Sequence, residues 1–177
     1  MKKRLISCHQ IVKLAFLISL LSPVTLTAHS LDGDLITIIL VRHAEKADNS
    51  HDPDLSEAGY ERAEKLAEMF KRVSFDAVYS TNFKRTQKTA KSTADLNDLD
   101  LQIYDHQNPT SQVEKWLEMH QGETILVCGH SNSTPTFANT ILEGEHFDES
   151  FDESDYGNIL IITIAGDGER KLLHLRY

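Results

Sequence analysis

The chain has 177 residues, 40% of them hydrophobic, which is enough for one well-buried core and short for two. Its formal net charge is −9 at pH 7, and a surface this acidic repels nucleic acid and anionic membranes. We therefore expect one domain and no nucleic-acid partner.

Residues 1–30 have the composition of a secretory signal peptide. Basic residues at 2–4 precede an apolar stretch at 14–21, and small or polar residues follow. That stretch is too short to serve as a stable bilayer anchor. We expect cleavage after Ala28 or Ser30 and a mature protein that is periplasmic or secreted, without stable membrane insertion. An uncleaved membrane anchor is the alternative.

Cleavage changes the charge and the cysteine content of the mature chain, residues 31–177. The leader holds four Lys/Arg and no Asp/Glu, so the remaining formal charge is 14 minus 27, or −13. Cys8 is lost with the leader, and Cys128 alone cannot form an internal disulfide. Cys128 ends an apolar run, so we interpret it as a small buried core residue.

The mature chain begins with the stretch ITIILVRHAE at 36–45, an apolar run that ends abruptly in Arg42, His43 and Glu45. A short run of β-branched and aliphatic residues is typical of a strand buried on both faces. Ser56 is a suitable N-cap for the helix that follows. Further strands are predicted at 75–79, 101–104, 124–128, 159–164 and 172–177, and further helices after 80–82, around 113–120 and near Ser133.

The alternation of strands and helices predicts a three-layer α/β/α sandwich with a mostly parallel sheet and an antiparallel C-terminal edge hairpin. In such a sheet the carboxyl ends of the strands are neighbours and form the usual ligand-binding edge. The residues that lie just past four different strands are Arg42, His43, Arg85, Asp105 and His130. We expect these side chains to lie close together.

Two arginines and two histidines at one sheet edge suit a tetrahedral dianion. Guanidinium groups present several fixed donors to phosphate oxygens and keep their charge. An imidazole that is neutral near pH 7 can attack phosphorus and carry the phosphoryl group covalently. A second imidazole can donate to the oxygens that gain charge in the transition state. The cationic residues supply the positive charge that magnesium supplies in other phosphoryl-transfer enzymes, so we expect neither a metal nor another cofactor.

Four stretches resemble the histidine phosphatase superfamily, in its phosphoglycerate-mutase-like branch 1 and most closely its compact members. They are LVRHAEKA at 40–47, DLSEAGYERAEKLA at 54–67, VYSTNFKRTQKTA at 78–90 and ILVCGHSNSTP at 125–135. The resemblance covers essentially the whole mature chain, residues 31–177, as one histidine phosphatase domain. The usual RHG is RHA here, and Ala44 adds only a methyl group.

The resemblance implies a role for each matching residue. His43 would be the nucleophile that becomes phosphohistidine, Arg42 and Arg85 would bind the phosphate, and His130 would stabilise the transferring group. Asn132 would contact the substrate or orient His130, and a plain helix-cap role is the alternative.

The acid that protonates the leaving group is less well defined, because this chain has little room for the insertion that carries it in larger relatives. The RHAE variant of the motif favours Glu45, and Asp105 is the second candidate. Glu45 can also be read as an ion-pair partner of an active-site arginine.

The resemblance implies a phosphoric monoester hydrolase of the histidine acid phosphatase type with a small phosphorylated substrate. Export and the RHAE motif favour sugar phosphates or lipopolysaccharide heptose phosphates. Compact relatives also dephosphorylate phosphohistidine on signalling proteins, which gives a protein phosphohistidine phosphatase as the alternative. A non-catalytic anion-binding envelope protein on the same fold is the alternative from another class. The oligomeric state is left open.

The remaining polar residues have simpler interpretations. His51, Asp52 and Asp54 could ligate a metal, but in a proline-containing polar loop such residues are more often solvated. An acidic segment at 143–155 carries seven carboxylates and has the composition of a mobile loop. We interpret four further histidines as surface residues: His106, His120, His146 and His174.

Overall fold

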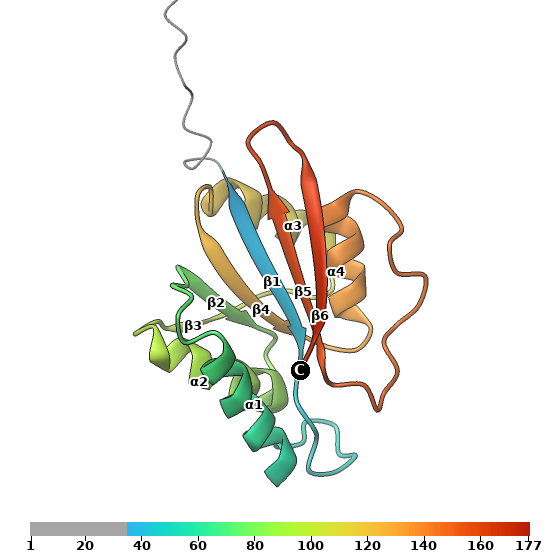
Figure 1. Cartoon of the computed structure of the whole chain (residues 1–177). Coiled ribbons are helices and arrows are strands. Elements are labelled where there is room, and N and C mark those ends of the chain that lie inside the picture. Colours follow the sequence, from blue (N-terminus) through green and yellow to red (C-terminus); the bar gives the residue numbers. More distant parts are fainter. Residues whose placement is uncertain (1–34) are drawn as a thin grey trace, which may run out of the picture. The chain divides into compact units, whose positions relative to one another are not determined.

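The computed structural model describes residues 35–177, so the predicted signal peptide and its cleavage site lie outside the described residues. This part of the chain is built around a six-stranded sheet in the order β3-β2-β4-β1-β5-β6 (Figure 1). Strands β1, β4, β2 and β3 pair in parallel, whereas β5 is antiparallel to β1 and β6 is antiparallel to β5. The strands are β1 Ile36–Arg42, β2 Ala77–Ser80, β3 Leu101–Ile103, β4 Thr124–Gly129, β5 Asn158–Ile164 and β6 Arg170–Arg176. The predicted fold class, with its antiparallel edge hairpin, is confirmed.

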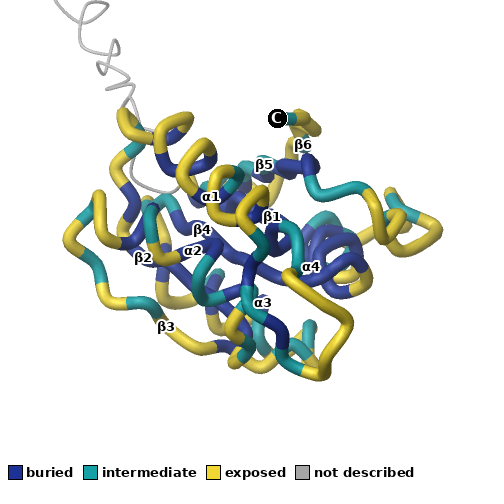
Figure 2. The backbone as a smooth tube through the Cα atoms, turned by 90° about the horizontal axis from the view of Figure 1, so that it is seen from below, coloured by how far each residue is buried: buried dark blue, intermediate teal, exposed yellow. Residues whose placement is uncertain are grey.

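Helices cover both faces of the sheet. Helices α1 (Glu57–Met69) and α2 (Lys84–Leu96) pack on one face, and α3 (Pro109–Met119) and α4 (Ser133–Leu142) pack on the other. The central strands are therefore buried between two helical layers, as the burial colours in Figure 2 show. Alternation along β1 sends Ile39 towards α1 and α2 and Ile38 towards α3 and α4, because successive side chains of a strand point to opposite faces.

Helix α1 begins where the sequence predicted. The Ser56 hydroxyl accepts a hydrogen bond from the Gly59 backbone N–H, which satisfies one of the free donors of the first turn. The same turn lies against the chain that follows β1, because the Ser56 N–H donates to the Glu45 carbonyl at 2.9 Å. Helix α1 thus supports the segment that carries His43.

The interpretation of His120 as a surface residue is wrong. His120 is buried, with its Nε2 2.8 Å from the Tyr79 hydroxyl and its Nδ1 2.6 Å from a Glu123 carboxylate oxygen. These two partners satisfy both ring nitrogens, which allows a polar ring to lie in the core at the end of α3.

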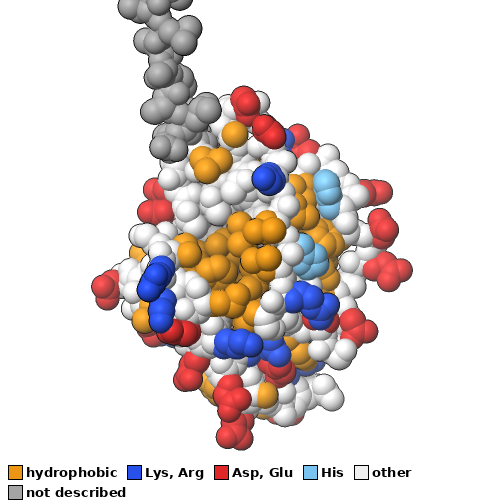
Figure 3. Space-filling view, viewed as in Figure 1, with side chains coloured by type: hydrophobic (Ala, Val, Ile, Leu, Met, Phe, Trp, Pro, Cys, Tyr) orange, Lys and Arg blue, Asp and Glu red, His pale blue; other side chains and the backbone are white. Residues whose placement is uncertain are grey.

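The β5–β6 part of the sheet is less covered than the centre. Leu173 and Leu175 on β6 are exposed and pair in register with Ile161 and Ile159 of β5. Figure 3, seen from the same side as Figure 1, shows hydrophobic side chains gathered in the middle of the molecule, with acidic side chains around the margin. Among the described helices, none has the length and apolar character needed to cross a membrane.

Candidate active site

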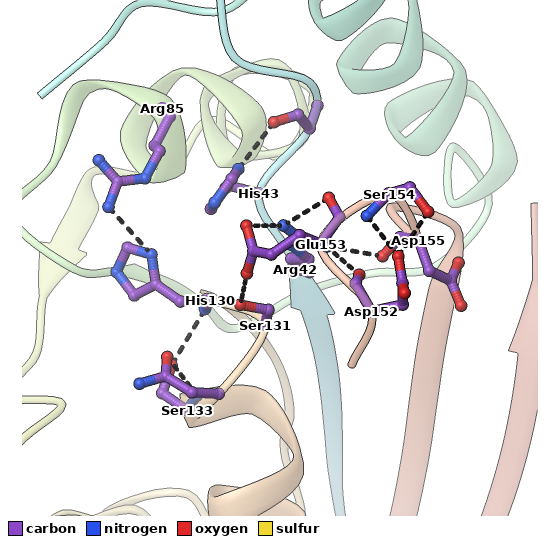
Figure 4. Close-up of polar contacts among 12 residues, drawn as sticks. Arg42, His43, Arg85, His130, Ser131, Ser133, Asp152, Glu153, Ser154 and Asp155 are labelled. Carbon is purple, nitrogen blue, oxygen red and sulfur yellow. Dashed lines mark hydrogen bonds and ion pairs between the residues drawn. The ribbon is translucent and has the colours of Figure 1, made fainter. Parts of the chain in front are cut away.

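The carboxyl ends of the central strands open onto one cavity of about 470 Å³. Four of the predicted site residues line it: His43, Arg85, His130 and Asn132. Figure 4 shows the two histidines and Arg85 facing one another across this space. The whole lining consists of His43, Lys46, Phe83, Arg85, His106, His130, Ser131, Asn132, Ser150 and Glu153.

Backbone pairing between β1 and β4 sets the distance between the two histidines. Arg42 lies opposite Gly129 in the parallel register, and the His43 N–H donates to the Gly129 carbonyl at 2.9 Å. His43 and His130 are therefore each the first residue beyond paired strand ends, and their ring centroids are 5.5 Å apart.

His43 has a defined tautomer. Its Nδ1 lies 2.7 Å from the Ala44 carbonyl oxygen, which can only accept, so Nδ1 carries the hydrogen. Burial lowers the pKa of His43 to about 4, and the charges of Arg42 and Arg85 act in the same direction against the hydrogen bond to Ala44. At neutral pH the ring is uncharged and its Nε2 keeps a lone pair.

His130 is held by polar contacts on both ring nitrogens. Its Nε2 lies 2.9 Å from the Thr81 hydroxyl, and the Arg85 guanidinium lies 3.4 Å from its Nδ1. Because the guanidinium can only donate, Nδ1 accepts and Nε2–H donates to Thr81. Burial lowers the pKa of His130 to about 3, with a further contribution from the charge of Arg85. The Phe83 ring packs edge-on against His130 with centroids 5.2 Å apart.

Arg85 lies in the first turn of α2, as predicted, where the helix dipole disfavours a cation and favours an anion. Its guanidinium lies over the Phe83 ring, 4.5 Å from the centroid, and burial lowers its pKa. The Arg85 Nε–H is buried and has no hydrogen-bond partner among the described residues. A group in this position is suited to a phosphoryl oxygen at the helix N-terminus.

Arg42 lies behind the cavity and is fully buried. Its terminal nitrogens donate to the carbonyl oxygens of Asp152, Glu153 and Asp155 at 2.7 to 3.1 Å, and also to the Glu153 carboxylate at 3.1 Å. The Nε–H has no partner in the described part of the chain. Arg42 therefore anchors the end of the acidic segment 143–155 against the site.

The two predicted acids lie outside the cavity. Glu45 forms a two-oxygen ion pair with Arg62 of α1, with N to O distances of 2.7 to 2.9 Å. Burial alone would raise the pKa of Glu45, but hydrogen bonds from Arg62 outweigh it and the pKa is lowered. Asp105 is exposed, and the backbone N–H of Gln107 and the Asn108 amide lower its pKa. The structure does not bring either carboxylate to His43.

Asn132 has the helix-cap role that was the alternative, and its contact with a substrate stays a prediction. It is the N-cap of α4, where its side-chain oxygen accepts from the Ser133 N–H at 2.9 Å, and it also lines the cavity. The residues of the polar loop before α1 have structural partners: Asp54 pairs with Lys88 at 2.5 Å, and Asp52 accepts from the Lys84 N–H. Within residues 35–177, no group of three or more His, Cys, Asp or Glu side chains is placed to hold a metal ion.

Several lining residues were not singled out from the sequence. Lys46 lies within the same motif as His43, and Ser131 directly follows His130, so proximity to the motifs could have suggested both. His106, interpreted as a surface residue, is half-buried with its ring 5.5 Å from that of His130. Glu153 had no such signal, because it is one of seven carboxylates in the acidic segment 143–155 and nothing in the sequence distinguishes it from the other six.

Comparison with known proteins gives matches in sequence and in fold. The sequence model of the histidine phosphatase superfamily (branch 1) matches residues 38–108. Phosphoserine phosphatase 1 of Hydrogenobacter thermophilus is 39% identical over 74 residues, which cover 38% of this chain and 35% of that protein. The chain thus spans about a third of the length of this curated relative.

Two solved structures show the likeness in fold. The mycobacterial glucosyl-3-phosphoglycerate phosphatase has a TM-score of 0.67 at 10% identity, covering 78% of this chain and 97% of that chain. The protein histidine phosphatase SixA, complexed with tungstate, has a TM-score of 0.63 at 15% identity, covering 79% and 96%.

Proposed function

We propose that this chain is a member of the histidine phosphatase superfamily (branch 1), whose sequence model matches residues 38–108, and that it is a phosphatase whose nucleophile is His43. One observation carries the proposal: a neutral His43 with a free Nε2 lies in one cavity with His130 and Arg85. The Ala44 carbonyl selects the tautomer that attacks, and the low pKa keeps the lone pair available well below neutral pH.

In this proposal the cations of the site bind the phosphoryl group before reaction. Arg85 and Lys46 are in the cavity lining, and the Arg85 Nε–H, which has no hydrogen-bond partner among the described residues, is the donor that we assign to a phosphoryl oxygen. Arg42 lies behind the lining and adds positive charge to the site. His130 contacts the transferring group, where negative charge from substrate favours its protonated form. Asn132 would donate its free amide N–H to an oxygen of the substrate.

The substrate that we propose is a small phosphomonoester with a hydroxylated leaving group. Ser131, Asn132 and Ser150 supply uncharged polar groups to the cavity, which suit hydroxyls. Sugar phosphates, including the heptose phosphates of lipopolysaccharide, have this chemistry. The related Hydrogenobacter protein is named for phosphoserine, which also supports a small phosphorylated substrate. On the basis of the signal-peptide pattern at residues 1–30, we place this activity in the periplasm or outside the cell.

The test is hydrolysis of p-nitrophenyl phosphate by the purified protein in the presence of EDTA, beside His43→Ala and Lys91→Ala. Lys91 is an exposed residue of α2 paired with Asp95 and serves as the matched control. We expect activity in the wild type and in Lys91→Ala, none in His43→Ala, and a phosphoryl group trapped on the peptide that contains His43. A wild-type protein inactive on aryl phosphates, alkyl phosphates and phosphohistidine peptides would contradict the proposal.

A protein phosphohistidine phosphatase is the second candidate. It is favoured by the positions of Glu45 and Asp105 outside the cavity, because a nitrogen leaving group does not depend on a carboxylic acid. It predicts rapid turnover of phosphohistidine peptides and little turnover of alkyl phosphates by the wild type. Measuring both substrates with one enzyme preparation separates the two functions.

A further inference from the structure

We propose that Glu153 is the proton donor to the leaving group, an inference that rests on the phosphomonoesterase activity proposed above. Glu153 is the only carboxylate in the lining of the cavity that holds His43, within the described part of the chain. It comes from the segment between α4 and β5, far along the sequence from Glu45 and Asp105, the two carboxylates that the sequence suggested.

Two contacts orient the Glu153 carboxylate over the site. One oxygen accepts a hydrogen bond from the Ser131 hydroxyl, directly after His130, and the other lies 3.1 Å from a terminal nitrogen of Arg42, directly before His43. The carboxylate is thus tied to residues adjacent to both histidines, and Figure 4 shows it between Arg42 and Ser131 on the side of the His43 ring.

The backbone of the same segment is fixed as well. Arg42 binds the carbonyl oxygens on both sides of Glu153, and the Phe151 N–H donates to the Ser131 carbonyl at 2.9 Å. A buried arginine that binds three carbonyls is a rigid anchor, because each donor is used in a fixed geometry. The Glu153 side chain itself is 70% exposed, so it can exchange protons with water between turnovers.

The proposed reaction has two steps. His43 Nε2 attacks phosphorus, the bond to the leaving oxygen breaks, and the Glu153 carboxyl gives its proton to that oxygen, releasing an alcohol. Water then attacks the phosphorus of phosphohistidine while the Glu153 carboxylate takes a proton from it, and the bond to His43 breaks to release inorganic phosphate. In the free protein the Ser131 hydroxyl and the charge of Arg42 favour the ionised carboxylate, and a bound phosphoryl dianion favours its protonation.

The experiment compares Glu153→Gln with wild type on a series of phosphomonoesters whose leaving groups range from alkyl alcohols to nitrophenol. The amide keeps a similar shape and can still contact Ser131 and Arg42. General acid catalysis contributes roughly 10² to 10⁴-fold, so kcat/KM for the alkyl phosphate should fall by about that factor. For p-nitrophenyl phosphate, whose leaving group needs no proton, kcat/KM should fall by less than about tenfold. Because the second step loses its base, phosphohistidine should accumulate and produce a burst of nitrophenol.

Controls separate a catalytic role from a structural one. Glu149→Gln removes a charge from the same acidic segment, Asp105→Asn tests the second acid suggested by the sequence, and both should retain wild-type leaving-group dependence. If Glu153→Gln does not fold, Ser131→Ala, which removes one orienting contact, takes its place. Its kcat/KM should fall more for alkyl than for aryl phosphates, by a smaller factor than predicted for Glu153→Gln.

An equal loss on alkyl and aryl substrates, or no loss on either, would overturn the assignment of Glu153. In both cases an active wild type and an inactive His43→Ala leave the proposed phosphatase function intact. Inactivity of the wild type on every substrate would instead overturn the proposed function itself.

Discussion

Lowering the pH from 8 to 5 should destabilise the protein through the two site histidines. Burial keeps His43 and His130 neutral in the folded state, with pKa values of about 4 and about 3, whereas in the unfolded chain each titrates near 6.5. The unfolded state therefore takes up protons first. Their contribution to the free energy of unfolding is fully present above about pH 6.5. It is lost as the pH falls from there towards their folded pKa values.

The size of the effect at pH 5 depends little on the exact folded pKa values. At that pH the unfolded rings are almost fully protonated and the folded rings are almost fully neutral. The solution lies about 1.5 pH units below the unfolded pKa, and each unit corresponds to about 1.4 kcal/mol. Each histidine should therefore lower the free energy of unfolding by about 2 kcal/mol, or about 4 kcal/mol together if they titrate independently.

The assay is urea denaturation at pH 8, 6.5 and 5, with His43→Asn as the comparison. Asparagine keeps an N–H that can donate to the Ala44 carbonyl but has no group that titrates in this range. Carboxylate titrations are common to both proteins and cancel in the difference. The variant should lose about 2 kcal/mol less than wild type between pH 8 and 5. Equal losses in the two proteins would refute the claim that His43 is held neutral by burial.

Two further predictions concern the support of the site. Gly59→Ala would place a Cβ 2.3 Å from the Glu45 carbonyl oxygen, so the segment after His43 must shift. We expect the free energy of unfolding, measured by urea denaturation, to fall by about 1 to 3 kcal/mol, and kcat to fall as well. Arg85→Lys replaces a planar set of donors with a point charge, so inhibition by inorganic phosphate should weaken by about tenfold or more.

The controls for these variants are exposed residues of the same helices. Glu61→Ala in α1 should have the same free energy of unfolding as wild type. If Gly59→Ala were as stable as wild type, the close contact with the Glu45 carbonyl would be relieved without cost, and the prediction would be wrong. Lys91→Ala in α2 should leave phosphate inhibition unchanged. If Arg85→Lys bound phosphate as tightly as wild type, the proposed role of Arg85 in phosphate binding would be wrong.

The positions of the histidines could be predicted because they depend on local patterns. Apolar runs define β1 and β4, and parallel pairing of their ends brings His43 and His130 together without knowledge of side-chain packing. Ser56 likewise defines the start of α1 through a short-range hydrogen bond. These features depend on residues close in sequence or on the regular geometry of a sheet.

The surroundings of the histidines could not be predicted in the same way. Glu153 is held at the site by Arg42, 111 residues earlier, and by Ser131, 22 residues earlier. Glu45 was favoured by its motif, but β1 ends at Arg42 and the chain then turns towards α1, where Arg62 is available. The burial of His120 likewise depends on Tyr79. In each case the deciding partner is a side chain distant in sequence.

The hydrogen bond from the His43 N–H to the Gly129 carbonyl has a consequence for redesign. It continues the pairing of the central strands β1 and β4 by one residue, so the spacing of the two imidazoles depends on the sheet and little on the surrounding loops. Segment 143–155, by contrast, could be varied at its other positions if Glu153 and the carbonyls that bind Arg42 were kept. The scaffold could then be given a different wall on this side of the cavity while the two imidazoles stayed in place.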